Sequence, residues 1–288
     1  MTVSSPEKTQ ALQLLTERLP SESAARIEAA ADGFLEVTTD RVHLMEVLRT
    51  LRDDPDLDCD LLLDVCGVDY PDRERRFEVV YHLRSLQKDH QLRVKVPLGQ
   101  DDPAVPTAYG LWKAADWFER EAWDLVGIRF DGHPNLRRLL THEAFQGHAL
   151  RKDYDPGQRW ILTEAETMVP TWVEETPEDE DHFETQILNI GPSHPATHGT
   201  LRTVVRLDGE VITKAESEIG YLHRCFEKMS ETHGWNQVIP YTDRLNYCSS
   251  MINGVGYALG VEQMLGIEAP PRAQVVRVIL SEFSRIMD

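Results

Sequence analysis

An acidic run divides this chain and limits how it can fold. Between residues 174 and 184, seven of eleven residues are Asp or Glu and none is Lys or Arg. Pro170 precedes the run and Pro177 lies within it. Carboxylates at this density repel one another and bury little apolar surface, so we interpret the run as a solvated linker rather than a cation site. The sequence therefore predicts a domain over residues 1–170, an acidic linker over 171–184 and a second domain over 185–288.

Composition excludes several classes of protein. The 288 residues are 41% hydrophobic and 27% charged, as in a soluble globular protein. The formal net charge of -19 argues against nonspecific nucleic-acid binding and against docking on anionic lipid through a basic face. Residues 1–10 are polar, unlike a signal peptide or anchor, and no apolar run approaches the roughly 20 residues that span a bilayer. Membrane association is therefore expected only through partners.

The four cysteines form no C-x-x-C pair. An iron–sulfur cluster or metal site held by this chain alone is therefore not expected. Free, mostly buried thiols in a reducing cytoplasm are the interpretation that this usage favours.

Hydrophobic periodicity predicts an α+β fold in both halves. In the first domain we expect helices over 7–31, with a break at Pro20, over 39–52 and over 110–125, and strands over 34–38, 61–65, 77–86 and 91–96. In the second we expect strands over 185–190 and 201–207, a hairpin at Asp208-Gly209 into 210–217, and then helices. The last helix begins at Pro270-Pro271 and its pattern has no cap at Asp288, so we expect a fragment of a longer protein.

The segment 189–199 is the first candidate site. His194 and His198 are four residues apart, the spacing of zinc ligands on one helix face, but Pro192 and Pro195 forbid a helix. A zinc hydrolase is therefore disfavoured. A rigid loop between two strands that presents two titratable rings is instead predicted to be functional.

Two further clusters carry charge or aromatic hydroxyls. Glu119, Arg120 and Asp124 are spaced to pair along one helix, ahead of a dense basic group formed by Arg137, Arg138, Arg151 and Lys152. The basic group suits either docking onto a carboxylate-rich partner or an internal salt-bridge network, with a Glu119–Asp124 catalytic dyad as a third option.

Downstream, Tyr241 and Tyr247 bracket Asp243 and Arg244 at the predicted start of a helix. A tyrosine hydroxyl and a histidine facing one cavity could hydrogen-bond the two carbonyl oxygens of a quinone and supply protons as it is reduced. Core packing with a satisfied hydroxyl is the alternative for Tyr247.

These motifs resemble a known family. Residues 119–139 and 147–154 are similar to the C subunit of respiratory complex I, the NADH:quinone oxidoreductase. Residues 191–199, 220–228, 241–247 and 270–285 resemble the beginning of the D subunit, which carries the quinone site. The two subunits are a single fused polypeptide in some bacteria, and the acidic linker lies where the fusion would be. The resemblance implies an N-terminal α/β sandwich, the linker, and an antiparallel sheet leading into a truncated helical bundle like that of hydrogenase large subunits.

The resemblance also implies roles. His198 and Tyr247 would hold the quinone head-group, with His194 in a lesser, loop-structuring role, and Arg244 would lie near the terminal iron–sulfur cluster of a neighbouring subunit. Arg137, Arg138, Arg151 and Lys152 would serve in docking onto partner subunits. The chain would bind quinone as substrate and hold no cofactor or metal of its own. FMN and iron–sulfur clusters would belong to partner subunits of the peripheral arm, and reduction would be coupled to proton translocation in the membrane arm. The expected location is peripheral, on the cytoplasmic side of the inner membrane.

The sequence departs from the family pattern at several points. Cys225 stands where the family usually has glycine, and Ala149 where it usually has proline. Most of the D subunit is absent, so the fragment alone is expected to be inactive. Two rival hypotheses remain open: a non-catalytic assembly or scaffold module, and a membrane-bound hydrogenase-like subunit, whose metal would need two C-x-x-C pairs.

Overall fold

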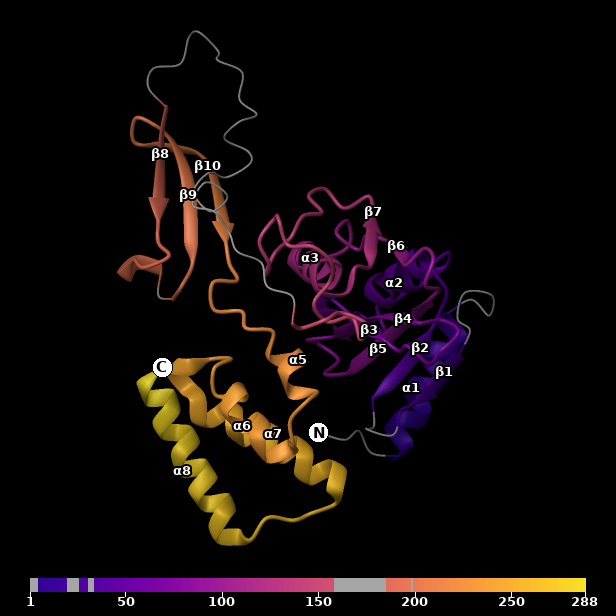
Figure 1. Ribbon diagram of the computed structural model, residues 1–288. Coiled ribbons are helices and arrows are strands. Elements are labelled where there is room, and N and C mark those ends of the chain that lie inside the picture. Colours follow the sequence, from indigo (N-terminus) through magenta and orange to yellow (C-terminus); the bar gives the residue numbers. More distant parts are fainter. Residues whose placement is uncertain (1–4, 20–25, 31–33, 158–184, 198) are drawn as a thin grey trace. The chain divides into compact units, whose positions relative to one another are not determined.

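The structure is a computed structural model that describes residues 5–19, 26–30, 34–157, 185–197 and 199–288 (Figure 1). The chain divides into two compact units, Met1–His223 and Arg224–Asp288. The predicted linker over 171–184, and with it the predicted domain boundary, lies outside the described residues.

The first unit is built on a five-stranded sheet with the order β1-β2-β5-β4-β3. β2 and β5 pair in parallel and the other neighbours pair antiparallel. A small parallel pair, β6-β7, flanks helix α3 in the sequence. The elements of this part are α1 (Ser5–Arg18), β1 (Arg26–Ala29), β2 (Leu35–Thr38), α2 (Leu44–Asp53), β3 (Leu61–Asp69), β4 (Phe77–Arg84), β5 (Gln91–Leu98), β6 (Ala104–Pro106), α3 (Ala115–Val126) and β7 (Arg129–Asp131).

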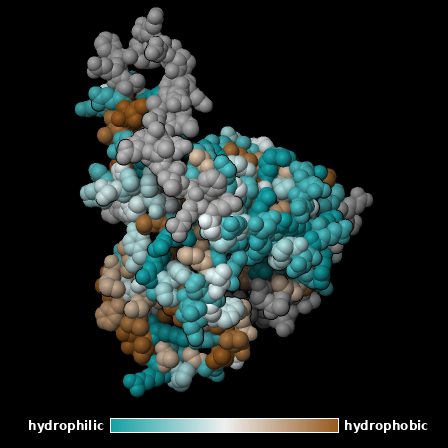
Figure 2. All heavy atoms as spheres, in the orientation of Figure 1, coloured by the Kyte–Doolittle hydropathy of each residue, from teal (hydrophilic) through white to brown (hydrophobic). Residues whose placement is uncertain are grey.

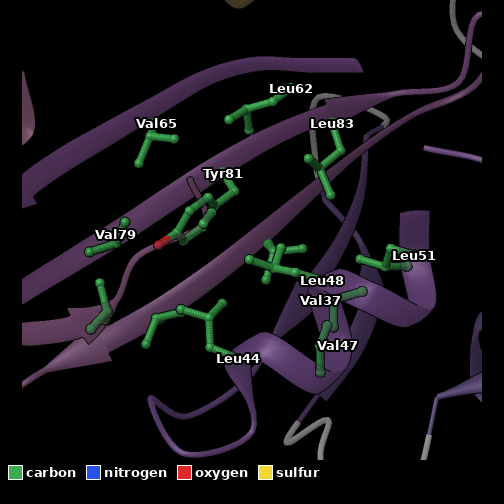
Figure 3. Packing of buried hydrophobic residues seen from close by; sticks show 14 of the residues in the cluster. Val37, Leu44, Val47, Leu48, Leu51, Leu62, Val65, Val79, Tyr81 and Leu83 are labelled. Carbon is green, nitrogen blue, oxygen red and sulfur yellow. The ribbon is translucent and has the colours of Figure 1, made fainter. Parts of the chain in front are cut away.

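The core of this sheet lies beneath α2. Leu44, Val47, Leu48 and Leu51 recur at helical spacing and are fully buried against strand residues that include Tyr81 (Figure 3). Each such side chain contributes about 1.5–3 kcal/mol through its removal from water. At the start of the helix, the Asp40 carboxylate accepts hydrogen bonds from the backbone N–H groups of Val42 and His43, at 2.9 Å each. The predicted strands over 34–38, 61–65, 77–86 and 91–96 are thus confirmed, with β3 continuing to Asp69. The helix predicted over 39–52 is present but begins at Leu44.

Two further predicted helices have wrong bounds. The helix expected over 7–31 ends at Arg18, and Arg26–Ala29 form β1, which pairs with β2. Ile27 lies opposite Val37. Pairing with β2 therefore makes residues 26–29 a strand, although their apolar spacing predicted a helix. The helix expected from residue 110 begins at Ala115, because residues 108–112 close a turn through Trp112 N–H and the Ala108 carbonyl.

A separate three-stranded antiparallel sheet, in the order β10-β9-β8, follows later in the first unit. It consists of β8 (Thr185–Ile190), β9 (Arg202–Asp208) and β10 (Val211–Glu218), and a 3-10 turn, η2 (Pro195–Thr197), lies in the connection between β8 and β9. The predicted hairpin at Asp208-Gly209 is confirmed, with Gly209 at φ +59°. The chain is therefore of mixed α+β class.

The second unit is helical. It contains α5 (Phe226–Ser230), α6 (Trp235–Thr242), a 3-10 turn η3 (Tyr247–Ser249), α7 (Ser250–Leu265) and α8 (Pro271–Met287). Arg277 of α8 binds Glu262 of α7 through two hydrogen bonds of 2.8 and 2.5 Å. Apolar side chains of α7 and α8 stand exposed, and Figure 2 shows brown surface over these helices. Among the helices described, none combines the length and the apolar character that a bilayer crossing requires.

Candidate functional site

The segment 191–201, here called the histidine loop, joins β8 to β9. Its two ends meet at Gly191, which has φ +92°. A Cβ at this position would collide with the carbonyl oxygen of Leu201. Only glycine combines that backbone angle with so close an approach, so the residue type determines how the loop closes.

Hydrogen bonds within the loop shape its described part. The Nδ1 atom of His194 accepts the backbone N–H of Ala196 at 3.1 Å. The Thr197 hydroxyl lies 2.7 Å from the His194 carbonyl and 2.8 Å from the Gly199 carbonyl. His194 thus braces its own turn through one ring nitrogen. His198, predicted as catalytic, lies outside the described residues.

A buried guanidinium lies at the base of the histidine loop. Arg202 is 7% exposed, and its Nε and Nη2 donate to Asn189 Oδ1 at 3.2 and 3.0 Å. Its Nη1 donates to Glu218 Oε2 at 3.2 Å, and the Tyr221 hydroxyl donates to the same oxygen at 3.3 Å. Burial raises the pKa of that tyrosine. The sequence analysis missed this cluster, although Asn189 and Arg202 lie close to the two ends of the loop.

Tyr247 lies in the second unit on a braced backbone. Its side chain is 52% exposed, and it is the first residue of η3. The neighbouring Asn246 amide and Ser249 hydroxyl both donate to Asp288 Oδ2, at 3.2 and 3.1 Å. Asn253 donates to the Asn246 carbonyl at 2.9 Å. The phenol is therefore accessible while the backbone on either side of it is held.

The other residues of this segment lie between two helices. The prediction that the segment from Tyr241 to Tyr247 starts a helix is wrong for Tyr241, which lies in the last turn of α6, while η3 begins at Tyr247 and α7 at Ser250. Its hydroxyl is 3.5 Å from His233 Nε2. The Arg244 side chain is 73% exposed, and its Nη1 donates to the Pro240 carbonyl at 2.7 Å and lies 3.8 Å from Asp243.

The basic group of the first unit is organised around Asp124 of α3. One carboxylate oxygen of this buried residue accepts three consecutive backbone N–H groups, from Leu139, Leu140 and Thr141, at 2.8–3.0 Å. Arg138 donates to the other oxygen at 2.8 Å. Although burial raises it, these hydrogen bonds hold the pKa of Asp124 below its usual range.

The internal contacts differ among the four basic residues. Arg138 also donates to the Gly147 carbonyl at 3.0 Å, and Arg151 Nε donates to the Val126 carbonyl at 2.6 Å. Arg137 forms ion pairs with Glu143, at 4.0 Å, and with Glu216. The Lys152 side chain is exposed, while its backbone N–H donates to Asp69 at 2.8 Å. An internal network thus accounts for Arg138 and Arg151, and docking stays a prediction.

Glu119 and Arg120 do not form the pairs expected along α3. Fully buried Glu119 accepts the Ala108 N–H at 2.6 Å and the Thr107 hydroxyl at 2.5 Å, while Arg120 donates to the carbonyls of residues 137 and 138. Burial raises the pKa of Glu119 to about 7. Glu119 and Asp124 are both enclosed and bound to backbone groups, an arrangement that anchors α3 rather than one that faces a substrate.

Within the described ranges, no group of three His, Cys, Asp or Glu residues could hold a metal ion. The four cysteines are free thiols: Cys59 is buried, Cys66 and Cys225 are half-buried and Cys248 is exposed.

Part of the first unit matches a known protein family. Residues 37–159 match the family described as the respiratory-chain NADH dehydrogenase, 30 Kd subunit. This segment therefore belongs to that family, and the sequence resemblance to complex I is confirmed.

The similarity to individual proteins extends along nearly the whole chain. The chain is 49% identical over 276 residues to the C/D subunit of NADH-quinone oxidoreductase from Bdellovibrio bacteriovorus, covering 96% of this chain and 48% of that protein. The corresponding protein of Methylococcus capsulatus is 42% identical over 281 residues, covering 90% and 47%. The chain is thus a homologue of these C/D subunits and spans about half the length of the curated relatives it matches.

Among solved structures, the trypsin-resistant fragment (1–134) of Nqo5 is 32% identical with a TM-score of 0.38, covering 45% of this chain and 98% of that fragment.

Proposed function

We propose that this chain is part of a fused C/D subunit in the peripheral arm of an NADH:quinone oxidoreductase. The observation that carries the proposal is the 49% identity to a named C/D subunit over 96% of this chain. In this proposal residues 1–170 form the domain like the C subunit and 171–184 the linker. Residues 185–288 form the first part of a domain like the D subunit, related in architecture to hydrogenase large subunits. The protein is peripheral, on the cytoplasmic side of the inner membrane.

His198 and Tyr247 contact the quinone head-group in this proposal, with His194 bracing the loop. Electrons from NADH reach the quinone through FMN and iron–sulfur clusters in partner subunits, and two electrons and two protons convert the quinone to a quinol. The accessible phenol of Tyr247, on a backbone held at both sides, supports a hydrogen-bonding role toward a carbonyl oxygen of the quinone. Reduction is coupled to proton translocation by membrane-arm subunits.

In this proposal Arg244 lies near the terminal iron–sulfur cluster of a neighbouring subunit. Its exposed guanidinium supports this part of the proposal, because a cation beside an iron–sulfur cluster raises the reduction potential of that cluster. The cluster then accepts an electron more readily before passing it to the quinone.

Within the basic group, Arg137 and Lys152 make most of the contacts with partner subunits in this proposal. Arg138 and Arg151 shape the surface from within through their contacts to Asp124 and to backbone carbonyls. Carboxylates on the partner surface would match this group in charge and geometry.

The test uses His198→Ala and Tyr247→Phe in the full-length protein, in membranes of its source cell. We expect each variant to lower NADH:quinone reduction about tenfold or more, because a hydrogen bond to a charged group contributes about 1.5–3 kcal/mol. Electron transfer from NADH to an artificial acceptor should stay unchanged. Tyr257→Phe is the matched control, since the Tyr257 hydroxyl donates to the Trp235 carbonyl. Wild-type quinone kinetics in both His198→Ala and Tyr247→Phe would contradict the site assignment.

A further inference from the structure

The two ends of the histidine loop are tied together by one side chain. Asn189 lies two residues before the loop, and Arg202 directly follows it. In the sheet register, Asn189 pairs with Val204 and Glu218 pairs with Arg202. Arg202 therefore reaches Asn189 diagonally across β8 and β9, and reaches Glu218 directly across β9 and β10.

The chemistry of this contact suits arginine. The guanidinium uses two nitrogens on Asn189 Oδ1 and a third on Glu218 Oε2, all within 3.0–3.2 Å. A planar fork can bind two neighbours at once, which a lysine ammonium on a flexible stem does less well. Arg202 is 7% exposed, so removing Asn189 or Glu218 would leave a buried guanidinium less well satisfied.

Beside the Arg202 contacts, the β8–β9 ladder holds the ends of the loop, since its last pair is Ile190 with Thr203. Gly191 and Leu201 touch at the mouth of the loop, while the bonds of His194 and Thr197 are internal to it. The Arg202 side chain therefore adds a tie across β8, β9 and β10 to this backbone ladder, at the place where both ends of the loop leave the sheet.

We propose that Arg202 is a positioning residue for quinone reduction, acting by clamping both ends of the histidine loop through Asn189 and Glu218. The inference rests on the proposed function, because it gives the loop its role at the quinone. Without the clamp, the loop ends can shift relative to the sheet. A displacement of about 1 Å at a reacting group can cost about 10²-fold in rate.

The experiment uses the full-length protein in membranes of its source cell, with a short-chain ubiquinone analogue as acceptor. Arg202→Gln and Asn189→Ala are each expected to raise KM for the quinone about tenfold, with a smaller change in kcat. The double variant should be no worse than the more impaired single variant, since both break one clamp. Arg206→Gln is the matched control, because Arg206 lies on the same strand opposite Ile187, away from the loop.

A general structural role predicts a different pattern. A loss of folded, assembled protein would lower artificial-acceptor activity and kcat together and would leave KM unchanged. That pattern in Asn189→Ala, whose native residue is exposed, would overturn the clamp even if Arg202→Gln failed to assemble. Additive effects of the two substitutions would overturn it as well.

The failure of the clamp can be distinguished from failure of the proposed function. If His198→Ala impairs quinone reduction while Asn189→Ala and Arg202→Gln leave KM at the wild-type value, the clamp is wrong and the proposed site stands. If His198→Ala also leaves quinone kinetics unchanged, the proposed site is wrong too.

Discussion

Two glycines with positive φ differ in what surrounds them. At Gly191, with φ +92°, an added Cβ would meet the carbonyl oxygen of Leu201, whereas at Gly209, with φ +59°, nothing lies within 4 Å. A left-handed conformation alone costs a residue with a side chain about 1–2 kcal/mol. A backbone collision adds to that cost, and it can be relieved only by moving the histidine loop.

We therefore predict that Gly191→Ala lowers the ratio of quinone reduction to artificial-acceptor reduction by about 10²-fold in the full-length protein. Gly209→Ala, the matched control, should leave this ratio within about twofold of the wild type, because its strain lies at the tip of a hairpin. The same activity assay on both variants is the measurement. Equal ratios in the two variants would show that closure of the loop at Gly191 does not matter for the quinone.

Cys225 shows what a single departure from a family pattern can mean. It adopts φ 52° and ψ 48° at the start of α5, the left-handed conformation that glycine favours. The usual glycine of the family would suit this position well. The sequence showed that Cys225 departs from the pattern, and the positive φ shows that the departure places a side chain in a conformation that glycine adopts more easily.

At the scale of elements, α3 is anchored by two buried carboxylates that bind opposite flanking segments. Glu119 binds residues 107–108, and Asp124 binds residues 139–141. Sequence pattern alone placed these charges in pairs along the helix. It could not reveal their burial, because their partners are backbone N–H groups that only the tertiary fold brings near.

Glu119 gives this anchoring a pH dependence. Burial raises its pKa from 4.5 to about 7, so the folded state binds more protons than the unfolded state between these values. The free energy of unfolding is therefore expected to fall as pH rises from about 4.5 to 7, by about 3 kcal/mol from this group.

Glu119→Gln should remove this component, because an amide can still accept the Ala108 N–H and does not titrate. The measurement is urea unfolding of the purified chain at several pH values between 5 and 8, followed by tryptophan fluorescence. Glu74→Gln, at an exposed turn position, is the control and should retain the wild-type slope. A wild-type slope in Glu119→Gln would mean that Glu119 is ionised throughout this range.

Local pattern predicted most elements, and the missed strand β1 shows where such patterns fail. Strand-like runs predicted β4 and β5, a possible cap at Thr39-Asp40 predicted α2, and an apolar stripe predicted α8. The four-residue β1 was missed because it is a strand only through its pairing with β2. Short segments carry too few residues for periodicity to outweigh such long-range contacts.

At the scale of the whole molecule, the sequence predicted where the candidate site residues lie along the chain but not how they are held. The proline-bearing loop and the segment ending at Tyr247 were both singled out from residue types. The contacts of Arg202 with Asn189 and Glu218 depend on the register of a three-stranded sheet, which residue types near the loop do not encode. The Asp288 contacts beside Tyr247 likewise join residues about 40 positions apart, 42 from Asn246 and 39 from Ser249.

Partner binding is the prediction that belongs to this scale. Exposed apolar side chains gather on α7 and α8, including Phe283 at 58% and Ile286 at 80% exposure, and such surfaces mark sites of interaction. We expect the tagged chain, expressed in its source cell and recovered from mildly solubilised membranes, to co-purify with flavin and iron–sulfur subunits identified by mass. The tag alone is the control. Recovery of the chain without partners would favour a scaffold module that acts elsewhere, and recovery with nickel-site maturation proteins would favour the hydrogenase-like hypothesis, so either result would overturn assignment to complex I.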